Sequence, residues 1–105
     1  MRLKNQLAAF ALTCLCASAA MAQDAATLNV RSLAATCASC HGTEGRSVNG
    51  SAIVSLAGMP RDAMLAQFKA FKDGSRSATV MHQLAKGYTD QQVEAMSTYF
   101  SNLKR

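Results

Sequence analysis

The stretch that decides the fold is Cys37-Ala38-Ser39-Cys40-His41, a Cys-x-x-Cys-His motif in a chain of 105 residues. On a helix, positions i, i+3 and i+4 share one face, so both thiols and the imidazole point the same way. This spacing is the attachment signature of c-type haem. The two thiols can bond to the vinyl groups along one porphyrin edge while the imidazole reaches the iron. The motif therefore predicts one covalent haem c, with Cys37 and Cys40 as thioether anchors and His41 as the proximal iron ligand.

Three other interpretations of the motif fit the sequence less well. A thioredoxin-like redox pair would follow a strand, whereas a helical pattern precedes Cys37 and a glycine-rich stretch follows His41. A zinc site would need a second pair of ligands, and only His82 remains to supply one. A structural disulfide would leave the adjacent imidazole without a role. We therefore expect haem attachment.

Residues 1–22 have the pattern of a cleaved export signal. Arg2 and Lys4 give a positive start, an apolar run follows from Leu7 to Ala17, and Ala20-Met21-Ala22 offers small residues for a peptidase. We expect cleavage after Ala22, with Ala17-Ser18-Ala19 as the second choice. The apolar part is shorter than the ~20 residues that a spanning helix needs, so we do not expect it to remain as an uncleaved membrane anchor. We also expect no membrane span in the mature chain. These features predict a periplasmic protein.

The mature chain, residues 23–105, is short enough to form a single domain. It has nine basic and six acidic side chains and no run of Lys or Arg, which argues against nucleic-acid binding. Its two cysteines lie too close together to cross-link distant parts of a fold. A chain of this size buries a limited share of its surface, so a large apolar cofactor would complete the core. We expect one monohaem domain over residues 23–105.

The hydrophobic spacing predicts an all-α fold. In chain order, the expected elements are a helix around residues 28–34, a long irregular loop over 41–58, a helix from Pro60 that ends before Gly74, a turn or two of helix over 78–85, and a last helix that starts at Thr89. The start of the last helix is the most clearly predicted boundary, because Thr89 and Gln92 match a capping box and Tyr88 precedes them as a hydrophobic staple.

A haem that only carries electrons needs a second axial ligand, and a Met thioether in that position raises the reduction potential. The mature chain offers four methionines: Met59, Met64, Met81 and Met96. Met64 and Met96 lie in apolar helical stripes, which is typical of core packing. Met59 follows the motif too closely to leave much chain for wrapping the ring. The position of Met81, between two predicted helices, favours it as the distal ligand.

His82 is the rival to Met81. Adjacent residues on a helix are turned by about 100°, so we do not expect both to face the iron, and we expect His82 to face solvent.

A haem peroxidase would need an acid–base group over the distal side, and His82 is the only candidate for it. A ligand sensor would need an effector domain, for which the sequence offers nothing. Both hypotheses are therefore weaker than electron transfer, and we expect no catalytic site of the chain's own.

The mature chain resembles the class I cytochromes c over nearly its whole length, through a leading helix, the motif with Gly42, a distal Met and a last helix with Tyr99-Phe100. Three stretches are more specific: Phe68 to Gly74, Ala78 to Met81, and Ala85 to Tyr88. They are similar to haem domains of the cytochrome subunit of flavocytochrome c sulfide dehydrogenase and to small cytochromes of the c4 type. In that family the Met at the end of the second of these stretches is the second axial ligand of the haem iron. The resemblance therefore implies that role for Met81.

The resemblance implies three main helices and a short one wrapped around a single haem c. It also implies a function, which is to accept electrons from a sulfide-oxidising flavoprotein and pass them to another cytochrome. A free-standing periplasmic carrier is the alternative. Scattered basic residues near Met81 could steer acidic partners or could be an ordinary solvated surface: Lys69, Lys72, Arg76 and Lys86.

The family usually has a proline in the loop that supports the proximal His, and residues 50–56 contain none. The sequence therefore leaves open which group accepts a hydrogen bond from the outer nitrogen of His41.

Overall fold

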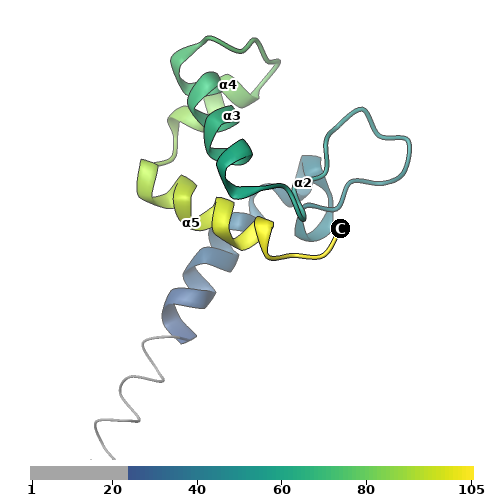
Figure 1. Cartoon of the computed structure of the whole chain (residues 1–105), viewed down its shortest axis with the longest axis vertical. Coiled ribbons are helices and arrows are strands. Elements are labelled where there is room, and N and C mark those ends of the chain that lie inside the picture. The colour runs from purple at the N-terminus through teal and green to yellow at the C-terminus, as the bar shows by residue number, and fades with distance from the viewer. Residues whose placement is uncertain (1–23) are drawn as a thin grey trace, which may run out of the picture.

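The structure is a computed structural model that describes residues 24–105. Residues 24–35 are helical, and the elements that follow are α2 (Ala38–His41), the 3-10 turn η1 (Thr43–Gly45), α3 (Arg61–Asp73), α4 (Met81–Lys86) and α5 (Asp90–Ser101). Residues 24–105 contain no strand, and the predicted all-α class is confirmed (Figure 1). The predicted export signal and its cleavage site lie outside the described residues.

Helix α3 lies at the centre of the fold and packs against both α4 and α5. It begins directly after Pro60, which is the residue before the helix rather than its first residue as expected. It ends at Gly74, whose φ of +82° is the left-handed conformation that a terminal glycine adopts without a Cβ clash. The 74–80 loop then leads into α4 at the far end of α3 (Figure 1).

Helix α5 begins with the predicted capping box. The hydroxyl of Thr89 accepts a bond from the main-chain N–H of Gln92 at 3.2 Å, and the Gln92 amide oxygen accepts one from the Thr89 N–H at 2.9 Å. Just before it, the Tyr88 ring lies edge-on to the Phe68 ring with centroids 6.4 Å apart. The Tyr88 hydroxyl is 2.7 Å from the hydroxyl of Thr36, which connects this corner to the leading helix.

The buried core forms where the leading helix, the residues before α3, and α3 itself meet α5. Its members are Ala34, Met59, Met64, Val93, Met96 and Phe100. Met64 and Met96 are almost fully buried, which confirms that they fill the core. Met59 joins the same cluster. Of the four methionines in the mature chain, Met81 is therefore the one that this core does not contain.

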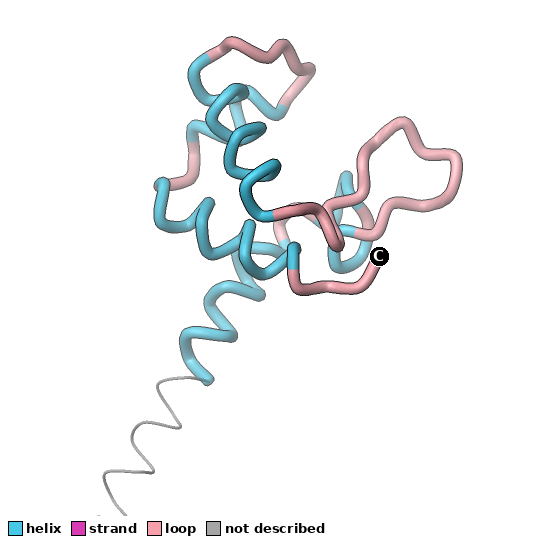
Figure 2. Tube along the Cα trace, viewed as in Figure 1, coloured by secondary structure: helices cyan, strands magenta, loops and turns pink. Residues whose placement is uncertain are grey.

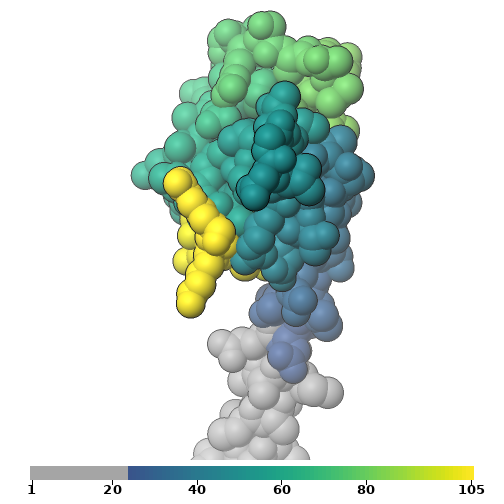
Figure 3. Space-filling view, turned by 90° about the vertical axis from the view of Figure 1, so that its right-hand side faces the viewer, coloured from purple at the N-terminus to yellow at the C-terminus, as the bar shows by residue number. Residues whose placement is uncertain are grey.

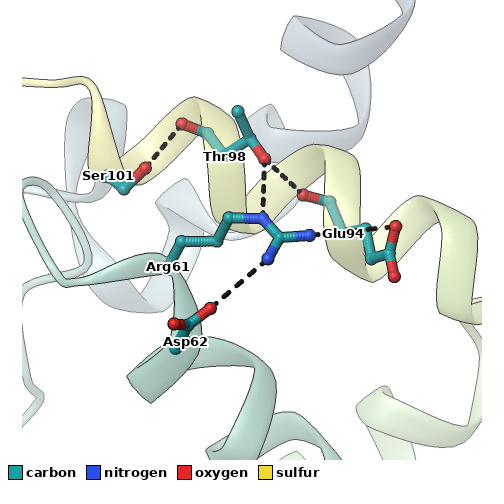
Figure 4. A network of polar contacts seen from close by, with 5 residues as sticks. All are labelled: Arg61, Asp62, Glu94, Thr98 and Ser101. Carbon is teal, nitrogen blue, oxygen red and sulfur yellow. Dashed lines mark hydrogen bonds and ion pairs between the residues drawn. The ribbon is translucent and has the colours of Figure 1, made fainter.

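A small polar network joins the start of α3 to α5 (Figure 4). The Arg61 guanidinium donates to the Thr98 hydroxyl at 3.2 Å and lies 3.3 Å from Asp62 and 3.9 Å from Glu94. The Thr98 hydroxyl in turn donates to the main-chain oxygen of Glu94 at 3.0 Å. The ionic groups are largely exposed, so the network orients the two helices and contributes little to the free energy of folding.

The irregular loop expected over residues 41–58 is shorter in the structure, because His41 ends α2 and residues 43–45 form η1. Residues 46–57 are irregular, and this loop is closed at its base (Figure 2). The main-chain oxygen of Gly45 accepts three bonds, from the N–H of Leu56 at 2.7 Å, from the N–H of Ala57 at 3.1 Å and from the Ser55 hydroxyl at 2.8 Å. Gly45 is buried with φ +73°, and a Cβ there would lie 2.8 Å from the Phe100 ring. The base of the loop therefore packs directly on α5.

Two segments that are far apart in sequence reach the same face of the molecule. Figure 3 shows the 46–57 loop in front on this face, with the segment from the end of α3 to α4 above it. In Figure 1 the 46–57 loop extends to the right of α3, and the segment from α3 to α4 passes over the upper end of α3. The sequence places the motif just before the first segment and Met81 within the second.

Candidate haem site

The motif forms the single helical turn that its spacing predicts. Cys37 is the residue before α2, and its main-chain oxygen accepts from the N–H of His41 at 2.9 Å and of Cys40 at 3.4 Å. A helical turn places Cys37, Cys40 and His41 on one face. Neither thiol is in a disulfide, so both are available to form thioether bonds.

The two thiols have different surroundings. Cys37 is half-buried and packs against the core, whereas Cys40 is exposed. Burial raises the pKa of the Cys37 thiol, a side-chain hydrogen bond with Thr36 opposes that shift, and the neighbouring Cys40 adds to it. Burial therefore favours the protonated form of the Cys37 thiol, and the Cys37 side chain packs against the core.

The His41 ring is held by a main-chain group of the loop. Its Nδ1 lies 2.6 Å from the main-chain oxygen of Val54. A carbonyl oxygen can only accept, so Nδ1 carries the hydrogen and donates it. The lone pair of Nε2 is then free to bind iron, and the bond makes the imidazole a stronger ligand. The partner that the sequence left open is thus a main-chain carbonyl, and no proline is needed to supply it.

Gly42 allows the chain to turn sharply away directly after His41. Its φ is +84°, and a Cβ there would lie 1.9 Å from the main-chain oxygen of Arg46. No other residue fits this position without moving the backbone. The turn leads the chain into the loop that returns with Val54, so Gly42 helps to place the acceptor beside His41.

Met81 is the first residue of α4 and is half-buried. Its thioether is not part of the buried core, whereas Met59, Met64 and Met96 are. The Met59 sulfur has a further contact, because the Gln67 side-chain nitrogen lies 3.9 Å from it. Of the four methionines in residues 24–105, Met81 is therefore the one whose side chain lies outside the buried core.

His82 differs from expectation. It is half-buried rather than solvent-facing, and its Nδ1 is shielded with no hydrogen-bond partner among the described residues. The sequence pattern around Met81 does not indicate that His82 is partly buried, because α4 is too short to show a clear apolar face.

Most of the exposed apolar side chains lie in the two segments that follow the motif and contain Met81. Of the six large hydrophobic residues exposed in the described part, three lie in the 46–57 loop and two flank Met81: Val48, Ile53 and Val54, then Val80 and Leu84. Their exposed fractions run from 42% to 77%. A ligand that covers exposed apolar side chains and removes them from water is favoured by the hydrophobic effect. Together with two free thiols and an oriented imidazole, they fit a flat apolar macrocycle.

The four basic residues expected near Met81 have different environments. The Lys72 ammonium is 2.9 Å from both the Asp90 carboxylate and the main-chain oxygen of Tyr88, so it joins α3 to the start of α5. The Arg76 guanidinium lies 4.9 Å from the centroid of the Phe71 ring. Lys69 and Lys86 are simply exposed.

Comparison with known proteins gives a family match over most of the chain. The family model of cytochrome c matches residues 29–104. The cytochrome subunit of sulfide dehydrogenase from Chlorobaculum tepidum is 41% identical over 73 residues, which are 70% of this chain and 64% of that protein. The thiosulfate dehydrogenase electron acceptor of Thiomonas intermedia is 39% identical over 71 residues, 68% of this chain and 33% of that protein.

A third relative has a similar length. Cytochrome c-553 of Nitratidesulfovibrio vulgaris is 34% identical over 89 residues, which are 82% of each chain. The present chain thus spans less than two thirds of the first two relatives and most of the third.

Proposed function

Because the chain belongs to the cytochrome c family and so carries a haem c, we propose that it transfers single electrons, with the haem held by Cys37, Cys40, His41 and Met81. When bound, the haem supplies an iron that alternates between the ferrous and ferric states. The observation that carries the assignment is the 2.6 Å contact between His41 Nδ1 and the main-chain oxygen of Val54, which leaves Nε2 available for iron.

Each side chain has a separate task in this proposal. The two thiols fix one porphyrin edge, with the Cys37 sulfur held against the core. His41 binds from one side, oriented by the loop. The Met81 thioether would bind the iron as well and, by favouring ferrous iron, would raise the reduction potential. A haem held by His41 and Met81 in this way would supply one-electron chemistry with little movement of these side chains.

For the electron donor we propose a dehydrogenase that oxidises a reduced sulfur compound, in particular a sulfide-oxidising flavoprotein. Two relatives support this proposal through their names, one a cytochrome subunit of sulfide dehydrogenase and one a thiosulfate dehydrogenase electron acceptor. The resemblance of residues 68–88 to the sulfide dehydrogenase family points in the same direction.

A free-standing carrier is the second candidate, and one observation favours it. The match to cytochrome c-553 covers 82% of both chains, so a protein of about this extent exists as a cytochrome in its own right. This candidate keeps the same haem ligands and differs in its partners.

Purification of the native protein through a terminal tag would separate the two candidates. A flavin signal in the same peak, in fixed ratio to the haem, supports the dehydrogenase subunit. A haem-only monomer that accepts electrons from other redox proteins supports the free carrier. A colourless protein contradicts both.

We propose a periplasmic location, with residues 1–22 removed and 23–105 forming one monohaem domain. Among residues 24–105, no helix is both long and apolar enough to cross a bilayer. The start of the mature chain is tested by N-terminal sequencing of protein taken from the periplasmic fraction. A chain that begins at Gln23 supports the proposal, and one that retains Met1 contradicts it.

A further inference from the structure

We propose that Asn49-Gly50 is a site of spontaneous deamidation, at which the Asn49 side chain is converted to aspartate or isoaspartate. Both residues lie in the 46–57 loop and are exposed. The inference rests on the geometry of this loop and not on the proposed electron donor.

The pair occupies the centre of a tight turn. The N–H of Ser51 donates to the main-chain oxygen of Val48 at 3.1 Å, and Gly50 has φ +81°. Asn49 is not among the residues with positive φ, so the turn is of type II, with Asn49 and Gly50 as its two central residues. One main-chain hydrogen bond therefore closes the turn.

The two reacting groups are not held by the rest of the protein. Among residues 24–105, neither the main-chain N–H of Gly50 nor the Asn49 side chain has a hydrogen-bond partner. A Cβ built on Gly50 would meet nothing within 4 Å, so the peptide has room to rotate. Opening the single turn bond is enough to bring the nitrogen to the side chain.

The reaction needs only water. The main-chain nitrogen of Gly50 loses its proton and attacks Cγ of Asn49, forming a new N–C bond. The bond from Cγ to the amide nitrogen breaks, and ammonia leaves after taking up a proton. Water then opens one of the two carbonyls of the five-membered succinimide ring. Opening at one carbonyl gives aspartate, and opening at the other gives isoaspartate; no oxidation or reduction occurs.

Two other asparagines serve as internal controls. Asn29 precedes Val30 within the leading helix. Asn102 precedes Leu103, whose main-chain N–H donates to the main-chain oxygen of Phe100 at 3.2 Å. Branched neighbours shield the attacking nitrogen, and helical hydrogen bonds oppose the rotation. Glycine does neither, which singles out Asn49.

The product would change the loop that orients the haem ligand. Both products add one negative charge, and isoaspartate also adds one carbon to the main chain, five residues before Val54. Because the Val54 carbonyl accepts the bond from His41, deamidation gives this protein a slow chemical change that affects its own redox site.

The test uses the haem-loaded mature protein, kept in mildly alkaline buffer and sampled over time. Peptide mapping by mass spectrometry follows all three asparagines, and isoaspartyl methyltransferase is the probe for isoaspartate. We expect Asn49 to convert while Asn29 and Asn102 stay intact.

Gly50→Ala should slow the conversion by about tenfold or more, because its Cβ shields the nitrogen. Asn49→Gln should remove the signal, and the haem spectrum of each variant verifies its fold. The proposal is overturned if Asn49 deamidates no faster than Asn102. It is also overturned if the deamidation rate of Asn49 is the same in Gly50→Ala as in the wild type.

Discussion

The Nδ1 nitrogen of His41 donates a hydrogen bond to the main-chain oxygen of Val54, 2.6 Å away and thirteen residues later in the chain. The bond joins the short helix of the motif to the far arm of the 46–57 loop. It fixes the tautomer and the orientation of the ring, so the loop positions the imidazole that we propose as the iron ligand.

The first prediction concerns this bond. Val54→Ala keeps the carbonyl and should leave the midpoint potential unchanged. Deletion of Val54 shifts the carbonyl out of register and should raise the potential, because an imidazole without this bond donates less charge to ferric iron. Spectroelectrochemical titration of both variants measures the effect. Equal potentials in wild type and the deletion variant, with the haem spectrum intact, would show that the bond does not tune the iron.

The second prediction concerns the distal ligand. Met81→Ala should abolish the far-red charge-transfer band between sulfur and ferric iron and should lower the midpoint potential, since the thioether favours ferrous iron. Met59→Leu is the matched control, because Met59 is buried in the core, and it should keep the band. A band that survives in Met81→Ala and disappears in Met59→Leu would assign the ligand to Met59 instead.

The third prediction compares two glycines with similar backbone angles. Gly45→Ala forces a Cβ to within 2.8 Å of the Phe100 ring and 2.9 Å of Leu56 Cβ, at φ +73°. It should lower the free energy of unfolding by roughly 3 kcal/mol or more. Gly74→Ala has φ +82° but open space around it, so it should cost only about 1 to 2 kcal/mol. Denaturant titrations followed by circular dichroism give both values, and similar losses would mean that the loop base does not pack tightly on α5.

The fourth prediction concerns Ser97, which is fully buried on α5 while its hydroxyl has no hydrogen-bond partner in the described part. Ser97→Ala removes an unsatisfied polar group and improves helix propensity, so it should leave the protein as stable or stabilise it by roughly 1 kcal/mol. Thermal unfolding of the haem-loaded variant checks this. Clear destabilisation would mean that the hydroxyl has a partner in the folded protein.

The sequence was sufficient for those parts of the fold whose signals are local. The motif spacing predicted one helical turn with two thiols and an imidazole on one face, and residues 37–41 form such a turn. Gly74 predicted the end of α3, and the pair Thr89 and Gln92 predicted the start of α5, because glycine and capping residues act on the backbone beside them.

The sequence was insufficient where the partner is a main-chain atom or lies in a distant segment. Val54 contributes its carbonyl, which every residue has, so no side-chain pattern indicates it. Lys72 looked like a free surface charge until the fold brought it to Asp90. The burial of His82 depends on how α4 packs, and a helix of six residues is too short for its pattern to show that.

Covalent haem attachment is tested by the intact mass of the denatured secreted chain, made in a host that attaches haem. We expect a mass equal to residues 23–105 plus one haem, with a reduced pyridine spectrum typical of two thioether bonds. Cys37→Ala and Cys40→Ala should each lose one of these bonds, and the double variant should lose the haem on denaturation. A mass equal to that of the polypeptide alone would contradict the central claim.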